Sequence, residues 1–138
     1  MFTNADCTVF NKRYNHETRS DIWCKTIIRG IYWEETTGIT CEKSTKITND
    51  SALFAAIPDN ADTGGKEYVS PKDFKAVSPE AAFTFAPEDI IIKGIIPEYI
   101  GGGTSVAALQ QKYDSIFVIT ECADLRFGGL PHIEVKGK

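Results

Sequence analysis

Apolar, β-branched and aromatic residues are gathered in short runs along the chain, and polar stretches containing glycine or proline separate these runs. Runs of this length that are rich in Val, Ile, Thr, Phe, Tyr and Trp predict β-strands, because these side chains fit a pleated, partly buried surface. The pattern predicts strands at residues 6–12, 21–35, 52–57, 83–85, 90–93, 115–122 and 132–136. A threonine-rich stretch at residues 37–48 predicts one or two weaker strands.

The longest run, DIWCKTIIRGIYWEE at residues 21–35, is too long to lie flat. We expect it to bend at Gly30, where glycine permits a β-bulge and lets the strand curve around a small barrel. Alternation along a strand separates two faces. The face expected toward the core holds Ile22, Cys24, Thr26, Ile28 and Tyr32, and the opposite face holds Trp23, Lys25, Ile27, Arg29, Ile31 and Trp33.

The second face mixes Trp and Ile with Lys and Arg, and this mixture has two interpretations. It suits a surface that another strand or another subunit partly covers. Equally, the aliphatic stems of Lys25 and Arg29 can lie over an ordinary exposed sheet while their charges stay in water. The pattern favours neither interpretation over the other.

Two short helices interrupt the strand pattern. Ser70 followed by Pro71 is typical of an N-cap with proline at the first helical position. Thr104 or Ser105 caps a second helix after three glycines. Seven or eight strands with two short helices predict a mainly β fold, a small barrel or sandwich, in a single domain over residues 1–138.

The least regular part of the chain is the loop at residues 59–80. A stretch of this length without regular structure is usually functional or mobile. It carries Tyr68 and Phe74, two large rings that a solvated loop does not need. We therefore expect the loop to project from the barrel and to contact a neighbouring subunit. In the alternative, the two rings fold back and cover an open end of the barrel.

Length and composition agree with one folded domain. Of the 138 residues, 42% are hydrophobic and 25% are charged, which is ordinary for a globular protein. A chain of this size can bury most of its apolar surface in one core. We expect that core to contain Val9, Ile22, Ile28, Phe54, Ile57, Ile91, Phe117, Ile119 and Val135.

The net charge of -4 argues against nucleic-acid recognition as the main role, because a protein that grips phosphates normally presents a basic face. The longest apolar run, residues 90–96, is interrupted by Lys93 and Gly94 and is too short to cross a membrane. The first residues, MFTNAD, lack the basic and apolar regions of a secretory signal. We expect a protein that stays in the cytoplasm of its producing cell and has no membrane partner.

The cysteine spacing does not predict a metal site. Structural zinc sites usually draw their thiolates from close pairs, because one tight turn aims two of them at one ion. The chain has four cysteines, with no such pair among them: Cys7, Cys24, Cys41 and Cys122. We expect them to be reduced core residues, and we expect neither a metal nor a cofactor.

No residue pattern predicts catalysis. A nucleophilic Ser or Cys needs a base, most often His, and His16 and His132 lie in a predicted turn and at the start of the last strand. The acidic segment 59–67 lacks the spacing of a calcium loop, and the glycines at 101–103 lack the lysine of a phosphate loop. We expect no catalytic residue. An enzyme would need His132 or the acidic segment in a cleft with strongly perturbed pKa values.

Four segments, spread from residue 6 to residue 138, follow one another in order: DCTVFNKRYNHETRSDIWCKTIIRGIYW, IPDNADTGGKEYVSPKDF, FTFAPEDIIIKG and FGGLPHIEVKGK. Together they resemble a family of short prophage proteins of unassigned function from Gram-positive bacteria. The opening hairpin is more distantly similar to that of phage head-closure and minor capsid proteins, which are small barrels assembled as rings. The resemblance implies a protein of the head-and-tail morphogenesis region.

From this resemblance we expect a phage or prophage structural protein, a head–tail connector or minor capsid component that acts by protein–protein contact. Its partners would be copies of itself in a ring or other oligomer and adjoining head or tail proteins, first in the host cytoplasm and then in the virion. The alternative is a monomeric intracellular small-barrel module that binds a peptide or small ligand. The candidate contact residues are Trp23, Lys25, Arg29, Trp33, Tyr68 and Phe74.

Overall fold

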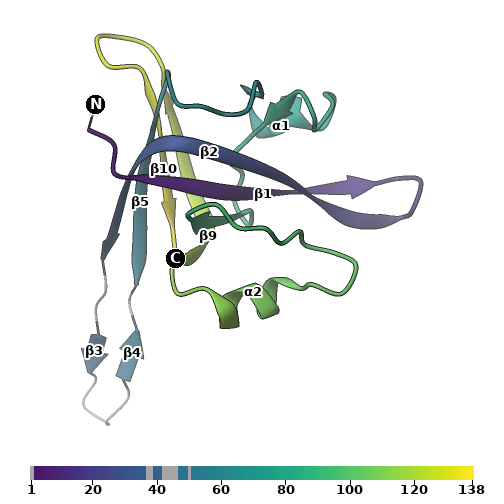
Figure 1. The fold of residues 1–138 in the computed structure, drawn as a ribbon, viewed down its shortest axis with the longest axis horizontal. Coiled ribbons are helices and arrows are strands. Elements are labelled where there is room, and N and C mark those ends of the chain that lie inside the picture. The colour runs from purple at the N-terminus through teal and green to yellow at the C-terminus, as the bar shows by residue number, and fades with distance from the viewer. Residues whose placement is uncertain (1, 37–38, 42–46, 50) are drawn as a thin grey trace.

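Six of the described strands form a closed antiparallel barrel in the computed structural model (Figure 1). The structure describes residues 2–36 and 51–138, and the backbone alone of residues 39–41 and 47–49. The strand order around the barrel is β1-β2-β5-β10-β9-β8, and β8 pairs back with β1. These strands are β1 (Ala5–Asn15), β2 (Ser20–Thr36), β5 (Ala52–Pro58), β8 (Ile90–Lys93), β9 (Ile116–Leu125) and β10 (His132–Gly137).

Four smaller strands of the described chain lie outside the barrel. β3 (Ile39–Cys41) pairs with β4 (Ile47–Asn49) in a two-stranded ribbon that continues from β2 and β5, at the lower left of Figure 1. β6 (Glu67–Tyr68) pairs in parallel with β7 (Ala82–Phe83). The 59–80 segment therefore has more regular structure than its sequence pattern predicts.

Two short helices begin where the sequence predicts them. α1 (Pro71–Phe74) follows Ser70, and α2 (Val106–Lys112) follows Ser105. In both, the cap hydroxyl accepts a hydrogen bond from the N–H of the third helical residue, at 3.2 and 3.1 Å. Such a bond satisfies one of the N–H groups that a helix start leaves unpaired. The predicted mainly β fold with two short helices is confirmed, and of the two predicted architectures, a barrel or a sandwich, the structure has the barrel.

β2 pairs with two neighbours in turn and changes partner at Gly30. Residues 20–29 and Ile31 pair with β1, Gly30 is left out of the pairing, and residues 32–36 pair with β5. The register of β1 against β2 shifts between Ala5 and Asp6. Gly30 has a φ of 82°, and its N–H donates to the Asp6 carboxylate at 3.0 Å. Because glycine adopts this φ without strain, the predicted bulge forms here and bends the strand.

The bulge exchanges the two faces of β2 beyond Gly30. Ile31 and Trp33 are buried inside the barrel. Tyr32 lies outside, with its ring centroid 6.3 Å from that of Phe54. The predicted faces of these three β2 residues are therefore wrong, because an extra residue in the strand shifts the side-chain period by one.

Seven of the nine predicted core residues are buried: Val9, Ile28, Ile57, Ile91, Phe117, Ile119 and Val135. Ile22 is 37% exposed, because the β1–β2 hairpin extends past the end of the barrel, at the right of Figure 1. Phe54 is half-buried on the outer side of β5. The core predictions for Ile22 and Phe54 are therefore wrong.

A second apolar cluster lies on the outside of the barrel, beneath α2. Phe10 of β1 and Ile90 and Ile92 of β8 are buried there by Ile96 and by Leu109 of α2. Further partly buried side chains pack around them: Trp23, Ile100, Val106, Tyr113, Ile116 and Val118. The chain itself thus covers part of the outer face of its barrel.

A buried polar network links β1 to the segment before β8. The amide of Asn11 donates to the Thr84 carbonyl at 2.6 Å and to the Asp89 carboxylate at 2.9 Å. Asp89 also accepts from the N–H groups of Lys12 and Ala86, at 3.0 and 3.1 Å. Burial raises the pKa of Asp89, and these donors oppose that shift because they stabilise the ionised form.

Two isoleucines on the same face of β2 should differ in their contribution to stability. Ile28→Ala removes a fully buried side chain and should lower the free energy of unfolding by about 2–5 kcal/mol, because a small core cannot collapse around the cavity. Ile22→Ala changes the same residue type beyond the barrel end and should cost less than about 1 kcal/mol. Urea unfolding measures both values. Equal losses would contradict the placement of Ile28 in the core.

Candidate contact surface

Three of the four predicted contact residues of β2 are engaged by the chain itself. Trp33 lies inside the barrel, and Trp23 packs in the cluster beneath α2. Lys25 donates from Nζ to the Ile96 carbonyl at 2.6 Å and lies 4.3 Å from the centroid of the Tyr99 ring. Burial lowers the pKa of Lys25. This part of the sheet is therefore covered by the same chain, through the 95–100 segment and α2.

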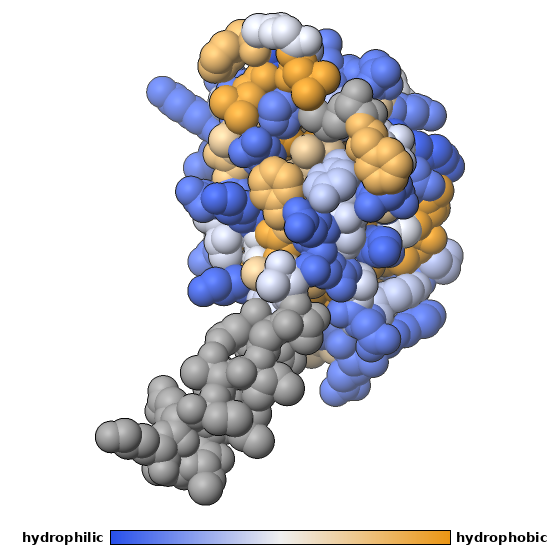
Figure 2. Space-filling model, turned by 90° about the vertical axis from the view of Figure 1, so that its left-hand side faces the viewer, coloured by the Kyte–Doolittle hydropathy of each residue, from blue (hydrophilic) through white to orange (hydrophobic). Residues whose placement is uncertain are grey.

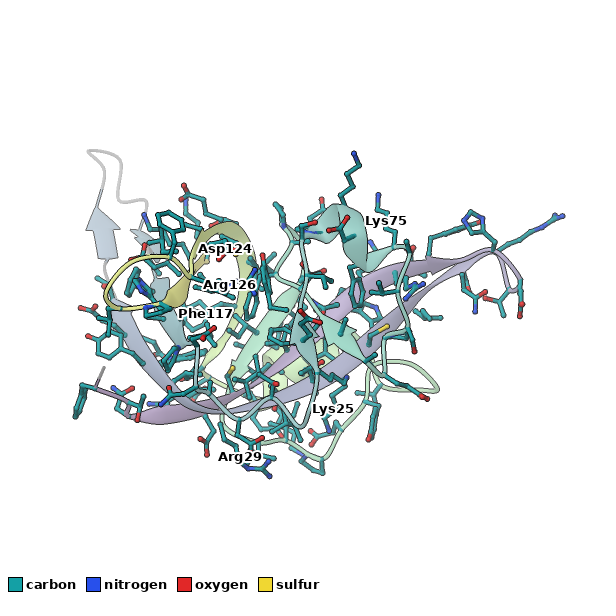
Figure 3. The ribbon with its side chains drawn as sticks, turned by 90° about the horizontal axis from the view of Figure 1, so that it is seen from above. Lys25, Arg29, Lys75, Phe117, Asp124 and Arg126 are labelled. Atoms are coloured by element: carbon teal, nitrogen blue, oxygen red, sulfur yellow. The ribbon has the colours of Figure 1, made fainter. Side chains whose placement is uncertain are left out.

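Arg29 is the exposed member of the β2 set. Its backbone N–H and C=O bond with those of Asp62, at 2.8 and 3.0 Å, so the 59–66 segment runs beside β2 at this point. Figure 3 shows the Arg29 side chain on the outer side of the hairpin, apart from Lys75 and Arg126. The predicted contact residues of β2 are therefore not gathered on one free surface.

Tyr68 and Phe74 fold back onto the barrel. The centroid of the Tyr68 ring lies 5.8 Å from those of both Phe83 and Phe85. Phe74 is 3% exposed and lies beneath Arg13, whose Cζ atom is 5.5 Å from the ring centroid. The expectation that both rings project outward is wrong, and the alternative, that they fold back over the barrel, describes the structure. Burying two large rings stabilises a small domain, because it removes their apolar surface from water.

Arg126 and Asp124 form a fixed polar platform over Tyr68. The guanidinium Cζ of Arg126 lies 4.9 Å from the Tyr68 ring centroid. Its Nε and Nη2 donate to the two carboxylate oxygens of Asp124, at 2.8 and 2.9 Å, and Figure 3 shows the pair side by side. These bonds lower the pKa of Asp124, and burial raises the pKa of Tyr68. At neutral pH the platform therefore combines a neutral ring with an ion pair.

The loop at residues 126–131, between β9 and β10, exposes two large apolar side chains beside this platform. Phe127 is 76% exposed and Leu130 is 54% exposed. The loop lies at the top of Figure 1, in yellow, and Figure 2 shows hydrophobic side chains gathered at the same end of the molecule. Apolar side chains that gather at one place on a surface, unlike single scattered ones, mark sites of interaction.

Hydrogen bonds hold this loop in place. Nδ1 of His132 lies 2.8 Å from the Leu130 carbonyl, and its Nε2 lies 3.2 Å from the Glu134 carboxylate. The N–H of Asp59 donates to the Pro131 carbonyl at 3.1 Å. The loop therefore presents its apolar side chains from an anchored backbone.

A cavity of about 320 Å³ opens beside the loop. Apolar side chains form part of its wall: Ile57, Pro58, Phe83 and Ile133. Charges of both signs line the rest, with Lys66 and Arg126 beside Asp59 and Glu67. An apolar hollow bordered by mixed charge can receive a side chain of another protein.

The sequence pattern singled out Tyr68 but missed Phe127, Leu130 and Arg126, because it predicted only a turn there. The available signal was the segment RFGGLP, in which apolar residues flank two glycines. Apolar residues in a turn are not explained by the packing of strands, and they therefore indicate a contact.

Neither a metal-holding group nor a thiol of lowered pKa is found among the described residues. No group of three His, Cys, Asp or Glu side chains among them could hold a metal ion. Cys7, Cys24 and Cys122 are free thiols, and burial raises the pKa of each, which makes them poor nucleophiles. No helix in this part of the chain is both long and apolar enough to cross a membrane.

The comparisons with known proteins assign no activity. A family model described as a family of unknown function (DUF6751) matches residues 2–138. No curated protein and no solved structure matches the chain. The role of the contact surface therefore has to be inferred from its own geometry.

The folded-back rings predict a loss of thermal stability when both are removed. Tyr68→Ala combined with Phe74→Ala should lower the melting temperature by several degrees, since about 1 kcal/mol corresponds to roughly 3–5 °C in a domain of this size. The control is Tyr99→Ala, which removes a ring that is 68% exposed. This variant should change the melting temperature little. Differential scanning calorimetry measures both. An unchanged midpoint in the double variant would mean that the rings do not support the fold.

His132 should make the stability depend on pH. Its bonds to the Leu130 carbonyl and to Glu134 raise its pKa, because both ring nitrogens donate only in the protonated form. This stabilisation is fully present below the pKa of an unfolded histidine and is lost as pH rises through the higher folded value. The difference in unfolding free energy between wild type and His132→Gln should therefore be larger at about pH 5.5 than at about pH 8.5. A difference that is independent of pH would contradict this assignment.

Proposed function

The chain belongs to this family of unknown function, and we propose that it is a structural protein that binds other protein chains through the surface around residues 126–131. The observation that carries the proposal is the exposure of Phe127 and Leu130 on an anchored loop. Apolar area in water is unfavourable, at about 25 cal/mol per Å², and a partner that covers it gains that free energy. Because the Leu130–Pro131 end of the loop is already held by hydrogen bonds, ordering the loop on binding costs less.

The residues around the loop suit a protein interface. Aromatic residues and arginine are enriched at the centres of interfaces, where they are the usual hot spots. Here Phe127 lies beside the stacked pair of Arg126 and Tyr68. The guanidinium is already paired with Asp124, so it can be covered without leaving an unpaired charge.

We take a second copy of the chain as the partner. The surface carries both signs of charge, with Arg126 and Lys66 near Asp59 and Glu67. A patch of mixed sign can face a copy of itself without net repulsion. The described backbone of β3 and β4 also forms a two-stranded ribbon whose outer edges pair with no other described strand, and such edges accept strands from other chains.

The resemblance to prophage proteins supports phage assembly as the setting. In that setting the chain would form a ring or another oligomer, as a head–tail joining or minor capsid component. Adjoining head or tail proteins would be its further partners. The proposal therefore covers contact between copies first and contact with neighbouring phage proteins second.

Self-association tests the proposal. Phe127→Ser combined with Leu130→Ser should abolish it, because the change removes the exposed apolar area at the centre of the surface. Tyr99→Ser is the matched control, since Tyr99 is 68% exposed elsewhere on the molecule. Sedimentation velocity over about a hundredfold range of concentration should show wild type and control associating and the double variant monomeric.

The double variant should keep the melting temperature of wild type, because both side chains are largely exposed in the monomer. A wild-type chain that stays monomeric throughout would overturn contact between copies. Association that survives the double substitution would show that the contact lies elsewhere.

A further inference from the structure

A larger cavity, of about 480 Å³, lies between the β1–β2 hairpin and α1. The hairpin extends past the barrel end, at the right of Figure 1, and α1 lies above it there. Residues from the hairpin, from the α1 segment and from the strand connection before β8 line the cavity. Its volume is within the range of small-molecule sites. None of these lining residues belongs to the loop at residues 126–131 or lines the cavity beside it.

Arg13 is fixed in the wall of this cavity. Its Nη1 donates to the Val77 carbonyl at 2.6 Å, and its Nη2 donates to the Lys75 carbonyl at 3.1 Å. The guanidinium also lies over the Phe74 ring, with Cζ 5.5 Å from the centroid. A guanidinium has five N–H donors, so these two bonds leave donors for a ligand. The side chain is half-buried and needs no reorganisation to bind an anion.

The cavity concentrates positive charge on an acidic protein. Lys12, Arg13 and Lys75 all line it, whereas the whole chain has a net charge of -4. Lys12 is paired with Asp21 at 3.5 Å, so Arg13 and Lys75 are the cations left for a ligand. Asp89 is the acidic group in the lining. Its oxygens accept three hydrogen bonds from protein N–H groups, and it is 2% exposed. The cations therefore dominate the part of the cavity that a ligand can reach.

Apolar groups form the rest of the wall. Phe74 and Pro71 line it from the α1 segment. Tyr14 and His16 line it from the hairpin, and their rings meet edge to face with centroids 4.9 Å apart. A positioned guanidinium next to aromatic walls is suited to a ligand with an acidic group on an apolar body.

We infer that this cavity binds an organic carboxylate carried on an apolar or aromatic body. Arg13, supported from below by Phe74, holds the carboxylate, Lys75 adds charge at the rim, and the exposed Tyr14 ring packs against the body. The planar fork of a guanidinium matches a carboxylate through two parallel hydrogen bonds. This site goes beyond the proposed protein contact, and neither depends on the other.

The source of the carboxylate can be a small metabolite or an acidic peptide group, since both offer the same chemistry. Phosphate offers the same charge without an apolar body, and it therefore separates charge recognition from recognition of the whole ligand. Phenylacetate, phenylacetamide and inorganic phosphate are suitable probes. The first two have nearly the same shape and differ in charge.

Titrations followed by two-dimensional ¹H–¹⁵N NMR test the inference on the intact chain. Phenylacetate should shift the amide signals of residues 12–16 and 71–77 in a saturable way, with a dissociation constant of about a millimolar for so small a probe. Phenylacetamide should give no saturable shift at those residues, because it lacks the charge that Arg13 binds. Phosphate should bind more weakly than phenylacetate, because it leaves the apolar walls uncovered. A glutamate-terminated peptide that binds more tightly than phenylacetate would identify a peptide as the source.

Matched lysine variants of the α1 segment separate this site from general charge effects. Lys75→Met removes a cation of the lining, and Lys72→Met removes an exposed cation of the same helix that does not line the cavity. Lys75→Met should weaken phenylacetate binding about three- to fivefold, as expected for one partly screened charge. Lys72→Met should leave it unchanged. Arg13→Gln should weaken it by about tenfold or more, because a charged hydrogen bond is lost.

Three results would overturn the inference. Equal effects of the two lysine variants would show that only the overall charge matters. Equal binding of phenylacetate and phenylacetamide would show that no carboxylate is recognised. Shifts that map to residues 126–131 would place the ligand at the other surface. Because both lysine variants leave the hydrogen bonds of Arg13 intact, the test stands even if Arg13→Gln does not fold.

Discussion

The bend of β2 at Gly30 is the constraint on which the rest of the barrel depends. A single strand has to pair with β1 along its first part and with β5 along its second, so that the sheet can close on itself. The extra residue of the bulge supplies that bend, and the Asp6 carboxylate binds the N–H that the bulge would otherwise leave unpaired. The same residue also turns Ile31 and Trp33 into the barrel. The closure of the barrel and the side chains that fill its core thus both follow from the bulge at Gly30. The interior of a six-stranded barrel is filled by side chains alone, so their direction decides how well it is packed.

A barrel this small cannot bury all the apolar residues of the chain inside, and the chain therefore covers its outside as well. α2 covers Phe10 and the outward isoleucines of β8, and the 59–80 segment folds Tyr68 and Phe74 back onto the strands. The first cover is a short helix with aliphatic side chains, and the second is a largely irregular segment with two aromatic rings. Among the described residues, Phe2, Ile95 and Tyr99 are also exposed, but at the loop at 126–131 and at the β1–β2 hairpin the exposed apolar side chains neighbour Arg126 and Arg13, which are held by hydrogen bonds. This contrast is what separates a contact surface from the rest of the barrel.

The parts of the fold that depend on near neighbours in the sequence could be predicted from it. Strand runs, helix caps and the bulge at Gly30 are all set by a few adjacent residues. The exchange of faces beyond the bulge, and the exposure of Ile22, depend instead on where the partner strands end, which no local pattern contains. Of the candidate sites, Tyr68 stood out as a ring in a loop. Arg13 gave no signal, because its partners lie more than sixty residues away along the chain.

The contact surface and the carboxylate cavity share one segment of the chain. Tyr68 forms part of the first wall and Phe74 part of the second, and only five residues separate them. Tyr68 is held by the core rings of Phe83 and Phe85, and Phe74 is held under Arg13. Packed side chains shift between discrete arrangements rather than deforming continuously. A small displacement of the α1 segment is therefore not passed on gradually to Tyr68, and each of the two surfaces keeps its own support.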